Sequence, residues 1–187
     1  AGPGQGRVGI TKLPAVVPPE MMLSVLGITG LTAYFGLLDL GMPKAGETVL
    51  ISGAAGATGS VAGQIAKMQG CHVAGSAGSD AKVAYIRDEL GFDTAFNYQT
   101  TASLGDALAQ AGPKGMDVYV ENVGGAMLDA VLLKVNPYAR IVACGMISQY
   151  NLEKPEGVKN LGTIVGNKVK IQGFIVSDHM DLKAEFM

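Results

Sequence analysis

Hydrophobic positions in this chain fall into short runs separated by longer segments of helical periodicity. From Thr48 onward, runs rich in valine and isoleucine recur, a pattern typical of strands buried on both faces of a parallel sheet. The predicted strands are residues 48–52, 72–76, 94–97, 117–121, 140–144 and 169–176. Six such runs are enough for a complete doubly wound sheet.

The segments between these strands carry helix formers with apolar residues at helical spacing. The predicted helices are residues 58–69, 80–90, 102–111 and 125–134. Gly70 and Gly91 follow two of them, where helix-ending glycines are common. Residues 20–40 predict one or two further helices, with breaks at Gly27 and Gly30. The fold class is therefore α/β, with a mostly parallel six-stranded sheet and helices on both faces.

The length of 187 residues and the 48% hydrophobic content suit one domain with one core. We expect residues 1–20 to be a linker or the remnant of another domain, and residues 21–180 to form the α/β domain. Residues 181–187 resemble the start of a truncated helix, and the first residue is not Met. These two features suggest a fragment of a longer protein.

Charge and cysteine content limit which partners and which cellular location are expected for the protein. A net charge of -2 provides no broad positive field for nucleic acid or an acidic membrane surface, so a small-molecule partner is expected. Cys71 and Cys144 lie in apolar runs, as buried free thiols do, which favours a cytoplasmic location. No run approaches the ~18 apolar residues of a membrane span. His72 and His179 are far apart and neither cysteine has zinc-site spacing, so no metal site is predicted.

A glycine-rich segment directly after the first strand is the strongest motif. Gly53, Gly56 and Gly59 stand where the strand turns into the next helix. A dinucleotide pyrophosphate needs a tight turn, close approach of the backbone and free amides at a helix N-terminus. The alternative, in which the glycines only permit close packing, explains one or two of them. No Lys-Ser or Lys-Thr pair follows Gly59, which excludes a nucleoside triphosphate loop. The motif predicts a Rossmann-type dinucleotide site.

The end of the second strand indicates which dinucleotide. Folds that prefer NAD place an acidic residue there, on the ribose 2′-hydroxyl, whereas residues 75–79 carry none. Asp80 opens the next helix and fits an N-cap, with Ser79 as the other candidate. Lys82, in the first helical turn, suits the 2′-phosphate of NADP(H). A solvated helix lysine is the alternative.

Several segments together resemble the zinc-independent medium-chain dehydrogenases/reductases, in the group of NADP-dependent alkenal double-bond reductases and prostaglandin reductases. The segments are residues 30–36, 54–60, 78–83, 96–98, 121–125 and 144–151. The resemblance covers nearly the whole chain. Members of that group are longer, with a catalytic domain that is not properly represented here, so this chain is expected to bind NADPH and to have little or no turnover alone.

The resemblance implies a set of cofactor-binding residues that runs from the pyrophosphate to the nicotinamide. The pyrophosphate is assigned to Gly56, Ala57, Thr58 and Gly59, and the 2′-phosphate end to Lys82 and Tyr98. The ribose and nicotinamide are assigned to Asn122, Cys144, Gly145, Met146, Ser148 and Tyr150. The nicotinamide pocket is assigned to Phe174, Ile175 and Val176.

The resemblance also implies a reaction, hydride transfer from NADPH to the β-carbon of an α,β-unsaturated aldehyde or ketone. Tyr150 resembles the tyrosine proposed to stabilise the enolate in that group, which makes it the catalytic candidate. The alternative is a purely structural or substrate-contacting tyrosine. The predicted edge strand suggests a homodimer through residues 171–176, as in related enzymes.

Three other functions remain open. A quinone reductase of the same superfamily would share the cofactor domain, and a non-catalytic NADPH-binding or dimerisation module would need no substrate site. Tyr150 and Lys154 also match the Tyr-x-x-x-Lys spacing of short-chain reductases, but Pro155 follows at once and disfavours the helix that this pair requires.

Overall fold

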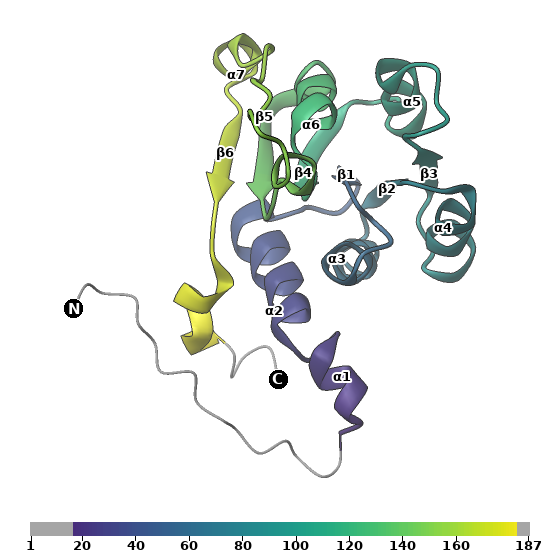
Figure 1. Cartoon of the computed structure of the whole chain (residues 1–187), viewed down its shortest axis with the longest axis vertical. Coiled ribbons are helices and arrows are strands. Elements are labelled where there is room, and N and C mark those ends of the chain that lie inside the picture. The colour runs from purple at the N-terminus through teal and green to yellow at the C-terminus, as the bar shows by residue number, and fades with distance from the viewer. Residues whose placement is uncertain (1–16, 183–187) are drawn as a thin grey trace, which may run out of the picture.

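The computed structural model describes residues 17–182 and contains one parallel sheet (Figure 1). Its strand order is β3-β2-β1-β4-β5-β6. The strands are β1 (Thr48–Ile51), β2 (His72–Ala77), β3 (Thr94–Asn97), β4 (Met116–Glu121), β5 (Val135–Ala143) and β6 (Lys170–Gly173). The chain runs outward from the central β1 in both directions, as in a Rossmann-type fold. The predicted fold class is confirmed.

Helices cover both faces of this sheet (Figure 1). The α-helices are α1 (Pro19–Leu23), α2 (Ile28–Phe35), α3 (Ala57–Met68), α4 (Asp80–Ala84), α5 (Leu104–Ala111), α6 (Gly125–Leu132) and α7 (Gly162–Asn167). Short π-helical turns continue α2 and α4, at Gly36–Gly41 and Tyr85–Glu89, and 3₁₀ turns occur at Ile147–Gln149 and Val176–Leu182. The helices predicted after the first, second, third and fourth strands are therefore present.

The core has two layers, one on each side of the sheet. On one side, Leu37, Ile65 and Ile86 bring the turn after α2, helix α3 and the turn after α4 against β1, β2 and β4. On the other, Leu108 and Leu128 bring α5 and α6 against the same strands and β5. All four residues of β1 are buried, which explains why its sequence is continuously apolar after Thr48.

The glycines before the sheet behave differently from the sequence prediction. Gly27 precedes α2 as its N-cap, so a break there is confirmed. Gly30 lies inside α2, and the break predicted at this residue is wrong. A Cβ at Gly30 would overlap the backbone oxygen of Val25, so the glycine permits a close approach of the preceding loop.

The last strand is shorter than the predicted segment 169–176. Lys170–Gly173 pairs with Arg140–Ala143 of β5, and both strands end there. Phe174 has no neighbouring strand to pair with and instead packs on Phe35 of α2, with 5.3 Å between the ring centroids. Of the predicted dimer segment 171–176, only residues 171–173 are therefore part of the edge strand. Helix α7 was not predicted.

Parts of the predicted domain division lie outside the described residues. This holds for most of the linker at residues 1–20 and of the terminal segment at 181–187. Pro19 and Glu20, which were placed in the linker, belong to α1. Leu182 ends a 3₁₀ turn. The domain boundaries stay a prediction.

Candidate functional site

The glycine turn after β1 is built from backbone contacts. Gly53 has φ +59°, a conformation that glycine adopts without strain. Its carbonyl accepts a hydrogen bond from the amide of Gly56 at 2.9 Å, and Gly56 is the N-cap of α3. The first amides of a helix have no partner within the helix, so the N-terminus of α3 presents donors above the sheet.

The third glycine of the turn stands where a side chain cannot fit. A Cβ on Gly59 would lie 2.5 Å from the Gly53 oxygen and 2.9 Å from the Ala54 Cα. The amide of Ala54 donates to the Ser76 oxygen at 3.0 Å, which ties the turn to the end of β2. The turn therefore cannot move away from a bulkier residue at position 59 without breaking contacts with the sheet.

A cavity of about 640 Å³ lies against this turn, at the carboxyl ends of β1, β2 and β4. It is lined by Gly53, Ala55, Gly56, Ala57, Thr58, Gly59, Ala77, Gly78, Lys82, Tyr98, Gln99, Asn122, Val123 and Ile147. The structure thus brings seven predicted cofactor-binding residues to one cavity: Gly56, Ala57, Thr58, Gly59, Lys82, Tyr98 and Asn122. Ligands of open α/β sheets bind at this edge.

One end of the cavity carries its charge. Among the described residues that line it, Lys82 is the only charged side chain. Ser79 is the N-cap of α4 and its hydroxyl accepts from the amide of Lys82 at 3.4 Å, so the cap predicted at Asp80 is wrong and the other candidate, Ser79, is confirmed. Tyr98 also lines the cavity, and a Cβ on Gly78 would lie 3.0 Å from the Tyr98 hydroxyl. This end is suited to an anion.

A buried carboxylate organises the middle of the site. Glu121, at the end of β4, is 0% exposed. Its Oε1 accepts from the Ser52 hydroxyl at 3.0 Å and from the amides of Val123 and Gly124. The Asn122 side-chain amide donates to the backbone carbonyl oxygen of Ser52 at 2.8 Å. Glu121 thereby fixes the loop that presents Asn122 to the cavity.

The loop after β5 is fastened to the loop after β4. The amide of Ile147 donates to the Asn122 oxygen at 3.1 Å, and the hydroxyl of Ser148 donates to the Val123 oxygen at 2.6 Å. Of the residues predicted in the later loop, Cys144, Gly145, Met146, Ser148 and Tyr150 lie beside the cavity's Asn122 end but not in its lining.

The hydroxyl of Tyr150 is held in place although the residue is 62% exposed. It accepts a hydrogen bond from the amide of Met146 at 3.0 Å. A phenol that accepts through its oxygen keeps its own hydrogen free to donate. The geometry therefore leaves Tyr150 able to act as a hydrogen-bond donor at the nicotinamide end proposed from the sequence.

Burial sets the chemistry of Cys144. Desolvation, with a smaller contribution from the charge of Glu121, raises the pKa of the Cys144 thiol to about 12. The thiolate is the nucleophilic form, so Cys144 is an uncharged packing residue at neutral pH and not a nucleophile.

The three residues predicted for the nicotinamide pocket do not line this cavity. Phe174 packs with Phe35 and Val142 in a separate apolar cluster, Val176 is buried, and Ile175 is exposed. Their placement follows from the early end of β6, because Phe174 turns into the cluster on α2. Their role in cofactor binding stays a prediction.

Sequence reasoning missed several residues that line the cavity. Gln99, in a turn, and Ile147, which opens a 3₁₀ turn, were not among the named cofactor-binding residues, and neither carries a signal of its own. Gly78 and Val123 had a weak signal, since each follows the end of a predicted strand, where binding residues of this fold gather.

Two findings bear on metals and membranes. Within residues 17–182, no three His, Cys, Asp or Glu side chains come together in a group that could hold a metal ion. In the same part of the chain, no helix has both the length and the apolar character needed to cross a membrane.

The parallel sheet, the glycine turn and the cavity at its carboxyl edge define a Rossmann-type domain. Residues 57–187 match the family model described as zinc-binding dehydrogenase, and the chain belongs to that family.

Relatives of the chain are reductases. It is 48% identical over 171 residues to the NADP(+)-dependent 2-alkenal reductase of Nicotiana tabacum, with 91% of this chain and 50% of the relative covered. It is 51% identical over 175 residues to prostaglandin reductase 1 of Mus musculus, with 90% and 53% covered. These matches confirm the resemblance drawn from the sequence.

A solved structure supports the same relationship. CurA from Vibrio vulnificus, crystallised in complex with NADPH, superposes with a TM-score of 0.85 at 42% identity, covering 95% of this chain and 53% of that one. The chain spans about half the length of the curated relatives that it matches.

Proposed function

We propose that this chain is the NADP(H)-binding domain of an oxidoreductase. The observation that carries the proposal is the cavity that the glycine turn and Lys82 of α4 line, with no carboxylate among its described lining residues. Gly56 and Gly59 would hold the pyrophosphate against the N-terminus of α3. A Cβ on Gly59 would meet the backbone of Gly53 and Ala54, so glycine at this position lets α3 begin close against the turn. Two relatives of this chain are named as an NADP(+)-dependent 2-alkenal reductase and a prostaglandin reductase.

We further propose that the whole protein reduces the C=C bond of α,β-unsaturated aldehydes or ketones. When bound, NADPH would supply the hydride. In this chain, Asn122 would orient the ribose side of the cofactor, and Tyr150 would donate a hydrogen bond to the oxygen of the enolate. The identity of 48% to a 2-alkenal reductase supports this substrate class over quinones.

Substitution of Lys82 tests why the chain would prefer NADPH to NADH. Lys82→Ala is expected to lower the ratio of NADPH to NADH affinity about tenfold, because a charge-assisted contact to the 2′-phosphate contributes about 1.5 kcal/mol. The dissociation constants are measured by cofactor fluorescence on the 187-residue chain.

Lys114→Ala is the matched control for this variant. Its removal changes the net charge by the same amount as the removal of Lys82. Lys114 is exposed and does not line the cavity, so no effect on the affinity ratio is expected. An unchanged affinity ratio in Lys82→Ala, or an equal fall in both variants, contradicts the role of Lys82. Absence of NADPH binding by the wild-type chain contradicts the proposed function itself.

The role of Tyr150 is tested by turnover of the whole protein. Tyr150→Phe is expected to lower kcat for an enal by about tenfold or more, because the enolate oxygen loses one hydrogen-bond donor. KM for NADPH should change little, since the phenol ring remains. Steady-state rates with an enal and with a quinone separate the two substrate classes. A Tyr150→Phe enzyme with unchanged kcat removes Tyr150 from the mechanism.

Assembly and location extend the proposal. We propose a homodimer through the edge strand β6, since Ile171 on this strand is 37% exposed at the end of the sheet order. Cys71 and Cys144 are free thiols, which is consistent with a reducing, cytoplasmic compartment. We also propose that the activity is independent of zinc.

A further inference from the structure

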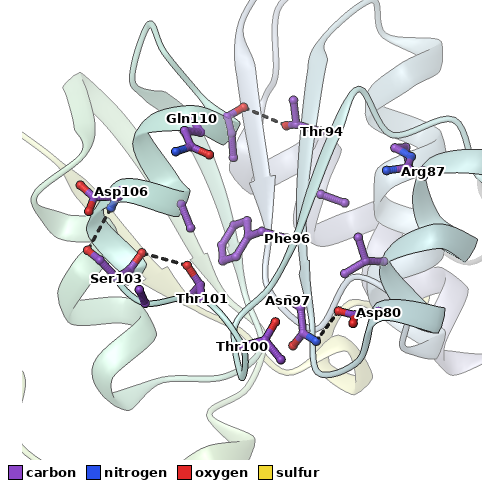
Figure 2. A pocket seen from close by; sticks show the side chains of 15 residues that line it. Asp80, Arg87, Thr94, Phe96, Asn97, Thr100, Thr101, Ser103, Asp106 and Gln110 are labelled. Atoms are coloured by element: carbon purple, nitrogen blue, oxygen red, sulfur yellow. Dashed lines mark hydrogen bonds between the residues drawn. The ribbon is translucent and has the colours of Figure 1, made fainter.

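A second cavity, of about 710 Å³, lies beyond the edge strand β3, between α4 and α5 (Figure 2). Its walls include Asp80 at the start of α4 and Asn97 at the end of β3. Neither of these side chains lines the cavity proposed for the cofactor, although Gly78, Lys82 and Tyr98, which do, are their close neighbours in sequence. Asp80 and Asn97 therefore stand at the boundary between the two cavities.

The amide of Asn97 makes two hydrogen bonds at this boundary. Its Nδ2 donates to Asp80 Oδ1 at 2.7 Å, which Figure 2 shows as a dashed line. Its Oδ1 accepts from the backbone amide of Gln99 at 3.0 Å. One side chain thus holds a carboxylate on the side of the second cavity, and also holds the backbone of the turn that carries Tyr98 and Gln99.

The position of the Asp80 carboxylate matters because of its charge. Asp80 is exposed, and it lies two residues from Lys82, the one charged side chain in the described lining of the proposed cofactor cavity. An aspartate released from its partner can change rotamer. If it moved toward that end of the cofactor cavity, its charge would weaken the positive potential there and repel a phosphate.

We propose that Asn97 is a specificity-determining positioning residue: by holding the Asp80 carboxylate toward the second cavity, it keeps the Lys82 end of the cofactor cavity selective for a 2′-phosphate. This inference rests on the proposed NADP(H)-binding function. Asn97 acts through Asp80 and the 98–99 turn and does not itself line the cofactor cavity.

An exchange of the two side chains tests the proposal. Asn97→Asp keeps an acceptor for the Gln99 amide but replaces the donor to Asp80 with a second carboxylate. The ratio of NADPH to NADH affinity is expected to fall about fivefold, which corresponds to about 1 kcal/mol, the repulsion of two like charges about 4 Å apart in bulk water. Adding Asp80→Asn to Asn97→Asp restores a donor and an acceptor with the original net charge. This exchanged pair should return the ratio to within about twofold of wild type.

Asp80→Asn alone is the matched control and should leave the ratio within about twofold of wild type, since an asparagine oxygen still accepts from Asn97. An unchanged ratio in Asn97→Asp overturns the proposal. So does a lowered ratio that the exchanged pair does not restore, because the effect then comes from charge at position 97 alone.

A second pair of variants covers the case in which Asn97→Asp does not fold, as judged by thermal unfolding. Asn97→Ala should lower the affinity ratio, and Asn97→Ala with Asp80→Ala should recover it, because the carboxylate is gone. Failure to recover overturns the proposal. A wild-type chain without NADPH preference instead contradicts the proposed function, so the two failures are distinguishable.

Discussion

Gly59→Ala is expected to weaken NADPH binding by at least about tenfold and to lower the free energy of unfolding by about 1–3 kcal/mol, the range for inserting a methyl group into a tightly packed place. The reason is that the new Cβ would meet the Gly53 oxygen at 2.5 Å and the Ala54 Cα at 2.9 Å. Both are backbone atoms that cannot rotate away. Cofactor fluorescence and urea unfolding measure the two effects.

Gly166→Ala is the control for this substitution. Gly166 lies in α7, and a Cβ there would meet nothing within 4 Å. Alanine is the better helix former, so this variant is expected to gain about 0.5–1 kcal/mol of stability without a change in NADPH affinity. A Gly59→Ala chain that binds NADPH as well as wild type would show that the turn after β1 does not hold the pyrophosphate.

Glu121→Ala is expected to lower the free energy of unfolding by about 3 kcal/mol or more, because it removes the acceptor of several buried donors. The Ser52 hydroxyl and the amides of Val123 and Gly124 all donate to Glu121 Oε1. Without it, the loop that carries Asn122 loses its anchor. Urea unfolding measures the loss, and NADPH titration of the folded fraction measures the effect on the site.

Two variants sharpen this prediction. Glu121→Gln keeps a side-chain oxygen for the same donors and should retain most of the stability. Glu153→Ala removes an exposed carboxylate and should change the free energy of unfolding by no more than about 0.5 kcal/mol. A loss below about 1 kcal/mol in Glu121→Ala would contradict the anchoring role, since a buried donor left without an acceptor costs at least that much.

The local features of this chain could be predicted from its sequence because they depend on neighbouring residues. Continuous apolar runs identify strands buried on both faces, and β1 is buried throughout. The turn requires glycine at 53 because of its φ of +59°, and at 56 and 59 because a Cβ there would meet the backbone of residues 53–54 of the same short segment. Two further features are local: no acid stands at the end of β2, and Lys82 follows it. The described lining of the cavity accordingly includes Lys82 and no carboxylate.

The tertiary structure decided what depends on distant segments. The end of the last strand is set by the end of β5, its partner, so Phe174 leaves the sheet and packs on Phe35. Position 30 is a glycine although it lies inside a helix, because the preceding loop approaches it closely, which no periodicity reveals.

The same reason applies to the site. Asp80 is next to Ser79 in sequence, but the side on which its carboxylate lies depends on Asn97, which a different strand supplies. Glu121 is an ordinary strand-end acid in the sequence, and only the approach of Ser52 from β1 and of the 123–124 amides makes it a buried anchor. Sequence determined which residues stand at the strand ends. Packing between strands decided which of them face the cofactor cavity, because side-chain direction there is fixed by hydrogen-bond partners far away in the chain.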